Sequence, residues 1–95
     1  MFAVILSYLR PREEVDLALA DHVAFLADFY AAGFGIASGR QVTGTGGVII
    51  ATAPSRAVLE AELAKDPFQV KGLARYDIYE FPPTTTHPAL RGVVS

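Results

Sequence analysis

Hydrophobic and polar positions alternate with two different periods along this chain. Four short runs rich in β-branched and aromatic residues predict strands over residues 2–8, 34–40, 48–53 and 75–81. Between them lie two segments whose apolar residues recur at steps of three and four, as on one side of a helix. The order is therefore βαββαβ. We expect an α+β, ferredoxin-like domain with a four-stranded antiparallel sheet.

The first helix is predicted over residues 12–32. Its apolar stripe consists of positions 15, 19, 22, 26 and 29, so that it includes His22. Glu13, Glu14 and Asp16 fall in the first turn, where the helix dipole favours anions. Gly33 follows at the place of a C-terminal glycine cap.

The second helix is predicted to open at Pro54 and Ser55, with Ser55 as the N-cap. Val58, Leu59 and Leu63 give it an apolar side. Because Pro67 disfavours helical geometry at the residue before it, this helix should stop at Asp66.

The predicted strands are apolar on both faces: Val4 alternates with Ile5, and Ile49 with Ile50. Two right-handed crossovers place both helices on one face of such a sheet, which leaves the other face bare. An apolar face of this size is rarely left exposed. We expect a homodimer in which two sheets cover each other as an α/β barrel. The alternative is a monomer whose tail covers the face. In either case the domain is expected to span residues 1–81, followed by a Pro/Thr-rich tail over residues 82–95.

Composition narrows the function classes. The 95 residues carry a net charge of −2 without clustered basic residues, which argues against nucleic-acid binding. The absence of cysteine excludes disulfides, thiolate nucleophiles and Cys-ligated metals. No apolar run approaches the length of a membrane span, and the start lacks signal-peptide features, so a cytoplasmic protein is expected.

Two polar residues stand out. His22 lies on the inward stripe, where a buried imidazole needs hydrogen-bond partners; spacing alone favours a satisfied core histidine over a functional one. Asp66 precedes Pro67 after a helix end, where it either simply marks the helix stop or aims a carboxylate at a neighbour. His87, in the tail, is a weak candidate.

Several segments, taken in order, resemble the YCII-related family. They are His22 within the first helix, A-A-G-F-G-I-A-S-G (31–39), G-G-V-I-I-A (46–51), D-P-F (66–68) and G-L-A-R-Y-D-I-Y-E-F (72–81). The resemblance runs from about residue 2 to 81 and rests on the combination, since no single motif is strong. It implies a ferredoxin-like subunit that dimerises as an α/β barrel.

The resemblance also implies that His22 and Asp66 form a catalytic pair. One activity associated with the family is elimination of HCl from a chlorinated hydroxyhydroquinone in bacterial degradation of chlorinated aromatics. Such a reaction needs no metal and no organic cofactor. A carboxylate on one ring nitrogen of histidine fixes the tautomer and leaves the other nitrogen as a base near neutral pH.

The chain departs from the family at two positions. An arginine is often found three residues before the histidine, where this chain has Leu19, and a proline often stands where this chain has Arg40. Arg10 and Arg40, both at strand ends, are candidates to bind a substrate anion in place of the missing arginine; solvated surface arginines are the alternative. Further candidate substrate contacts are a hydrogen bond from Ser38 and ring stacking from Phe68 and Tyr8.

Three hypotheses about function remain. The first is a cofactor-free lyase or isomerase that acts on a small hydroxylated, aromatic substrate through His22 and Asp66. The second is a small-ligand binding or sensing domain that uses the same pocket without chemistry. The third is a structural or interaction module in which His22 is only a core residue. A haem or metal site is disfavoured because no further ligand lies in register with His22.

Overall fold

A computed structural model of the chain describes residues 1–93. Its strands are β1 (Phe2–Tyr8), β2 (Gly35–Arg40), β3 (Gly46–Ala51) and β4 (Ala74–Glu80). Its helices are α1 (Arg12–Asp16), α2 (Leu19–Ala31), α3 (Arg56–Leu63) and α4 (Pro67–Val70), with a 3₁₀ turn η1 (Pro88–Leu90) in the tail.

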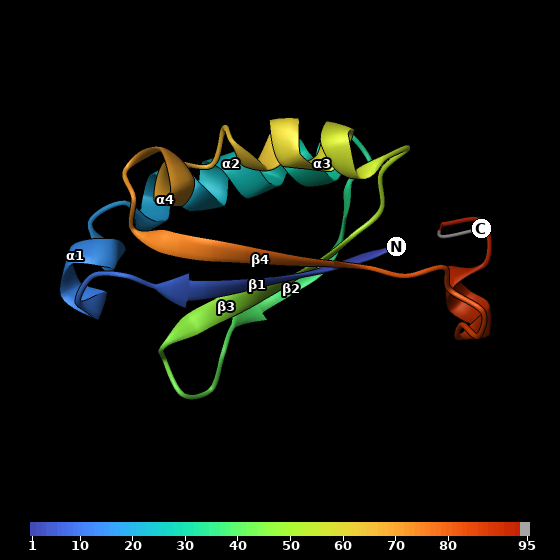
Figure 1. Ribbon diagram of the computed structural model, residues 1–95, viewed down its shortest axis with the longest axis horizontal. Coiled ribbons are helices and arrows are strands. Elements are labelled where there is room, and N and C mark those ends of the chain that lie inside the picture. The colour runs from blue at the N-terminus through green and yellow to red at the C-terminus, as the bar shows by residue number, and fades with distance from the viewer. Residues whose placement is uncertain (94–95) are drawn as a thin grey trace.

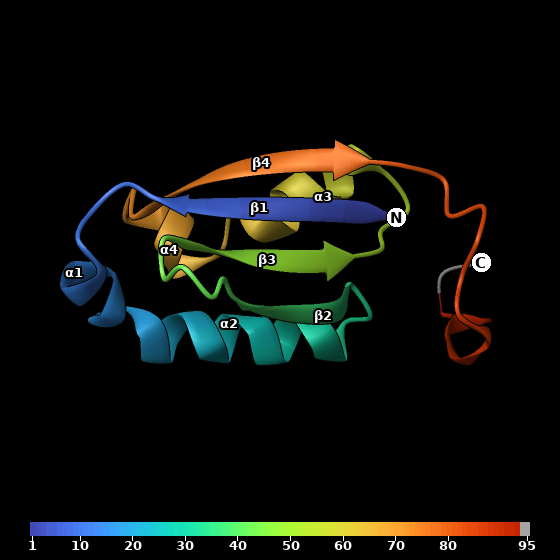
Figure 2. The ribbon, with the colours of Figure 1, turned by 90° about the horizontal axis from the view of Figure 1, so that it is seen from below.

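The four strands form one antiparallel sheet in the order β2-β3-β1-β4. Figure 1 shows α2, α3 and α4 on one side of this sheet, and Figure 2 shows α2 running along β2 while α3 lies behind the other strands. The predicted ferredoxin-like α+β fold is therefore confirmed, with both crossover segments on the same face.

Alternation along β1 divides the sheet into two faces. Phe2, Val4 and Leu6 are buried beneath the helices, whereas Ala3 and Ile5 between them are only half-buried. The buried core between sheet and helices includes Phe2, Val4, Leu6, Val15, Phe29, Ile49, Ala51, Leu59, Leu63 and Phe68. Each large apolar side chain buried there stabilises the fold by roughly 1.5–3 kcal/mol.

One irregularity in β2 decides which of its residues face the helices. Gly35 pairs with Ala51 of β3, but two residues later Ala37 pairs with Ile50, because a bulge adds one residue between them. Beyond the bulge, Ser38 lies opposite the buried Ile49 and therefore shares its inward face. Arg40, two residues further, also lies on that face.

The predicted helix over residues 12–32 is divided in two. Ala18 leaves helical geometry with φ −101° and ψ 4°, and α2 starts at Leu19. The break lets α1 lie at the end of the sheet while α2 runs along its face (Figure 1). The predicted C-terminal glycine is confirmed: Gly33 has φ +90°, and the amide of Phe34 donates to the carbonyl of Phe29, as in a Schellman cap.

The second crossover follows the sequence more closely. The hydroxyl of Ser55 accepts a hydrogen bond from the amide of Val58 at 3.2 Å, which confirms the predicted N-cap. The helix ends at Leu63, before the predicted stop. Asp66 then caps a new turn, α4, with Pro67 in its first position. A residue read as a helix stop therefore also starts a helix.

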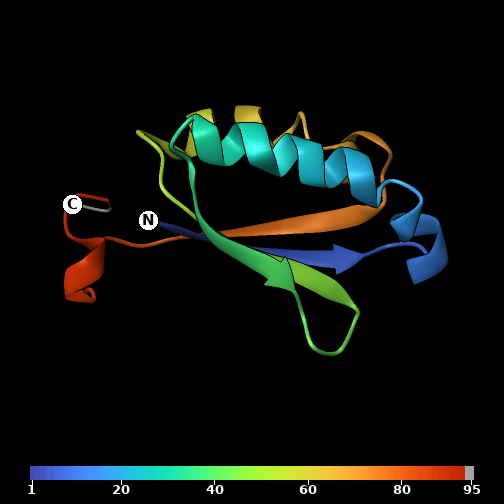
Figure 3. The same ribbon diagram turned by 180° about the vertical axis from the view of Figure 1, so that it is seen from behind.

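The face opposite the helices is open in the part of the chain that the structure describes. Figure 3 shows the sheet from behind with no helix on that side, and residues 82–93 extend beyond the strand ends rather than across the sheet. The tail therefore does not take the covering position considered above. Within residues 1–93, no helix is long and apolar enough to cross a membrane.

Candidate active site

His22 and Asp66 are in direct contact although 44 positions separate them. His22 lies one turn into α2, and Asp66 is the N-cap of α4, which folds back over the start of α2. Their Nδ1 and Oδ1 atoms are 2.8 Å apart. His22 is 9% exposed and Asp66 is fully buried, so the contact is shielded from water.

The Asp66 carboxylate is surrounded by donors. Oδ1 accepts the amide hydrogen of Phe68 at 3.1 Å as well as the His22 contact, and Oδ2 accepts the hydroxyl hydrogen of Tyr76. Burial raises the pKa of Tyr76, and its hydrogen bond to Asp66 acts in the same direction, so the phenol stays protonated and donates. Three donors of this kind offset the cost of burying the carboxylate.

These donors fix the state of the histidine. With the carboxylate accepting at Nδ1, neutral His22 carries its hydrogen on that nitrogen, and Nε2 is left with an unshared pair. The ring also stacks on Phe68, with centroids 3.9 Å apart and planes 4° from parallel. Its orientation is therefore held by both a hydrogen bond and a packed face.

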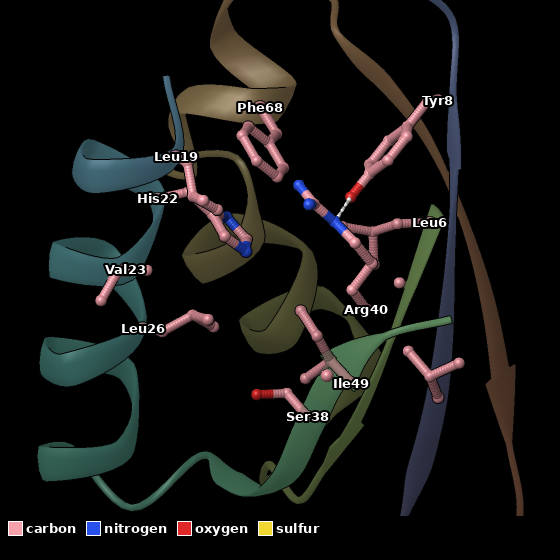
Figure 4. Close-up of a pocket in the computed structure, with 13 residues that line it drawn as sticks. Leu6, Tyr8, Leu19, His22, Val23, Leu26, Ser38, Arg40, Ile49 and Phe68 are labelled. Carbon is pink, nitrogen blue, oxygen red and sulfur yellow. Dashed lines mark hydrogen bonds between the residues drawn. The ribbon is translucent and has the colours of Figure 1, made fainter. Parts of the chain in front are cut away.

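The His22 ring forms part of the wall of a cavity of about 210 Å³ between α2 and the sheet (Figure 4). Leu19, Val23 and Leu26 of α2 supply an apolar wall, and Ile49 and Leu6 continue it on the sheet. The cavity is smaller than the roughly 300–1,000 Å³ of pockets for drug-sized ligands. A molecule of about one ring suits it.

Arg40 faces His22 across this cavity (Figure 4). Its Nε donates to the hydroxyl of Tyr8 at 3.0 Å, and its Nη2 donates to Oδ1 of Asp16 at 2.5 Å. These two hydrogen bonds raise the pKa of Arg40, so the guanidinium remains a cation at the polar end of an otherwise apolar cavity.

Four of the five substrate-contact residues proposed from the sequence line this one cavity: Tyr8, Ser38, Arg40 and Phe68. Arg10 does not. Its guanidinium is exposed and pairs with Glu14 of α1, four residues further along the chain. His87 is also distant in the fold, where it caps the amide of Ala89 in the tail.

Sequence reasoning missed Tyr76 and Asp16. Tyr76 alternates with Ala74 and Ile78, a spacing that places all three on the inward face of β4. That period was available as a signal for inward position, but the contact with Asp66 depends on tertiary packing. Asp16 was assigned only to a helix start, because no pattern in the neighbouring sequence indicates its contact with Arg40.

A family model for the YCII-related domain matches residues 1–82. The chain belongs to the YCII-related family. Among solved structures, this YCII-related chain is similar to 5-chloro-2-hydroxyhydroquinone dehydrochlorinase (TftG) from Burkholderia phenoliruptrix AC1100, in complex with 2,5-dihydroxybenzoquinone. The TM-score is 0.71 at 22% identity, over 85% of this chain and 93% of the other. That likeness shows the fold. No curated protein matches the chain in sequence.

Proposed function

We propose that the chain is a cofactor-free lyase that eliminates HCl from a chlorinated hydroxyhydroquinone, with His22 and Asp66 as its acid/base pair. The observation that carries the proposal is the buried His22–Asp66 contact of 2.8 Å at the wall of a one-ring cavity. The similar dehydrochlorinase, whose structure contains a dihydroxybenzoquinone, supports the choice of substrate class.

The proposed reaction requires the protein mainly to transfer protons. His22 Nε2 takes the proton of the hydroxyl adjacent to the chlorinated carbon and returns it to that carbon, which becomes tetrahedral as the oxygen becomes a ketone. His22 then takes the proton of the hydroxyl para to the first. An electron pair of the oxygen that is left forms the second carbonyl, and the adjacent ring double bond moves toward the chlorinated carbon. Chloride leaves with the electron pair of the carbon–chlorine bond. A hydroxyquinone and HCl result, and no external oxidant is consumed.

The other cavity residues have defined parts in this proposal. Arg40 holds the phenolate that forms when the first proton leaves, because it is a cation facing His22. Ser38 hydrogen-bonds a second ring oxygen, and Phe68 and Tyr8 contact the ring. Asp66 stabilises the imidazolium that His22 becomes.

We also propose that two copies pair through their open sheet faces. Ile5, Val48 and Ile50 lie on that face and are only half-buried, and Tyr79 is 61% exposed. Covering them in a dimer removes this apolar surface from water. Ile50→Lys should yield monomers in light scattering; a wild-type chain that stays monomeric at high concentration contradicts this pairing.

The function is tested with 5-chloro-2-hydroxyhydroquinone and its unchlorinated counterpart. We expect release of one chloride per molecule, together with quinone absorbance, from the chlorinated compound only. His22→Gln should fold and lose most of this activity. Thermal stabilisation by both compounds without chloride release would instead identify a binding or sensing domain. If the compounds neither stabilise the chain nor release chloride, a structural module is the remaining hypothesis.

A further inference from the structure

Tyr76 lies behind the proposed acid/base pair, outside the cavity wall. It projects from the edge strand β4 on the helix-covered face, and its backbone pairs with Leu6 of the internal strand β1. Its hydroxyl contacts Oδ2 of Asp66, whereas His22 and the amide of Phe68 both contact Oδ1. The two carboxylate oxygens are therefore held by different elements of the fold.

This division of contacts has a mechanical consequence. Contacts to Oδ1 alone leave the carboxylate able to turn about its Cβ–Cγ bond, since torsions of this kind have broad energy wells. A donor on Oδ2 fixes the plane of the group. Tyr76 is the side chain that gives Oδ2 its hydrogen bond, and its backbone is held by pairing with the central strand β1.

We propose that Tyr76 is a positioning residue that locks the Asp66 carboxylate and thereby holds His22 in the tautomer with Nε2 unprotonated. It acts through Asp66 and touches no substrate. The role in catalysis rests on the proposed function, but the effect on the His22 ring does not, so the two are tested apart.

The strand offers a matched control. Tyr79 lies three residues along β4, is 61% exposed in the single chain and faces the opposite side of the sheet, where Tyr79→Phe keeps the ring that the proposed dimer would cover. Tyr76→Phe and Tyr79→Phe each delete one hydroxyl from the same strand, but only the first removes a donor from Asp66.

The first readout is the tautomer of His22, measured by ¹⁵N NMR of the ring at a pH where it is neutral. We expect wild type and Tyr79→Phe to show one form, with the hydrogen on Nδ1. Tyr76→Phe should show a mixture of both tautomers. A single, wild-type tautomer in folded Tyr76→Phe overturns the proposal, whether or not the protein is an enzyme.

The second readout is turnover of 5-chloro-2-hydroxyhydroquinone. Loss of a residue that orients a metal-coordinating histidine typically costs about 10–100-fold, and by analogy we expect a fall of about 10-fold in kcat at unchanged KM for Tyr76→Phe. An equal effect from Tyr79→Phe overturns the assignment. If the wild type releases no chloride while the tautomer still responds, the proposed function fails and the positioning role stands.

A third measurement needs no variant and covers the case in which Tyr76→Phe does not fold. A hydroxyl hydrogen held by a buried carboxylate exchanges slowly with water, so the wild-type proton NMR spectrum should contain a Tyr76 hydroxyl resonance. Fast exchange of that hydrogen overturns the proposed lock.

Discussion

Two clusters of similar composition lie on opposite sides of the cavity, and they differ in burial. Each contains a tyrosine, an aspartate and a basic side chain: Tyr76, Asp66 and His22 on one side, and Tyr8, Asp16 and Arg40 on the other. Asp66 is fully buried, whereas the side chain of Asp16 is 40% exposed. The same chemical groups are therefore placed in very different dielectric surroundings.

Burial suits the two clusters to different tasks. A buried ion or hydrogen-bonded carboxylate is held in one geometry, because breaking any contact leaves an uncompensated polar group. An exposed pair is screened by water and exchanges partners at little cost. In the proposed reaction, the fixed geometry of the His22 cluster therefore suits proton transfer, and the more exposed Arg40 cluster suits binding of a substrate anion.

The largest contrast is expected in turnover. His22→Gln removes the base but keeps a polar side chain, and kcat should fall by about 10²–10⁴-fold, the usual contribution of positioned proton transfer. Asp16→Asn, in the other cluster, should leave kcat within a few-fold of wild type. Steady-state kinetics with the chlorinated hydroquinone make the comparison; equal losses in the two variants would remove the distinction between the clusters.

The next contrast is in stability. Asp66→Ala leaves His22 and Tyr76 without their shared partner and deletes the cap of α4, so the free energy of unfolding should fall by about 3–5 kcal/mol. Asp16→Ala should cost no more than about 1 kcal/mol. Urea unfolding measures both. Asp66→Asn keeps a cap and should lie between them; a neutral Asp66→Ala would show that the buried cluster is not structural.

Arg40→Lys tests whether the cluster of Tyr8, Asp16 and Arg40 binds substrate. Lysine keeps the charge but cannot contact Tyr8 and Asp16 together with a ligand. We expect KM for the hydroquinone to rise by about 10-fold, with kcat changed less. Arg10→Lys is the matched control, since that guanidinium lies outside the cavity, and an equal rise in KM there would argue against a binding role specific to Arg40.

The smallest effect concerns alkaline pH. Because the folded-state pKa of Tyr76 is raised, the unfolded chain releases this proton at a pH where the folded chain retains it. The stabilisation is thus fully present below a pH of about 10 and declines above it, by up to about 1.4 kcal/mol per pH unit. Tyr76→Phe should flatten this decline in denaturant unfolding, while Tyr79→Phe should retain it.

Local periodicity was sufficient for the architecture but not for the site. The alternation in the strands and the three-four spacing of the helices predicted the βαββαβ order, and Gly33 and Ser55 ended or began helices as expected. The break at Ala18 was missed because the apolar stripe continues through it. Periodicity describes which side of an element is buried and says little about where its axis bends.

The contacts of the site depend on how elements pack, and single segments do not encode this. His22 and Asp66 were paired only through the resemblance to a family, since spacing alone favoured a core histidine and a simple helix stop. Tyr76 could be predicted to face inward, but not to reach Asp66. In the sequence, Arg10 and Arg40 are equivalent candidates because both lie at strand ends. The fold places Arg40 in the cavity wall and leaves Arg10 in solvent.

Because of the bulge in β2, the residues that line the cavity depend on the register of this strand against β3 as well as on their identity. If Gly35 to Arg40 all paired with β3 in unbroken alternation, Ala37 and Gly39 would face α2, and Ser38 and Arg40 would point out from the open face. Deletion of Ile36 removes the bulge and keeps Ser38 opposite Ile49, whereas a shift of the residues after Gly35 by one position along β3 exchanges a cationic wall for a bare one. Two chains with the same residues in this strand but a different register can therefore present different groups to a ligand on the same scaffold.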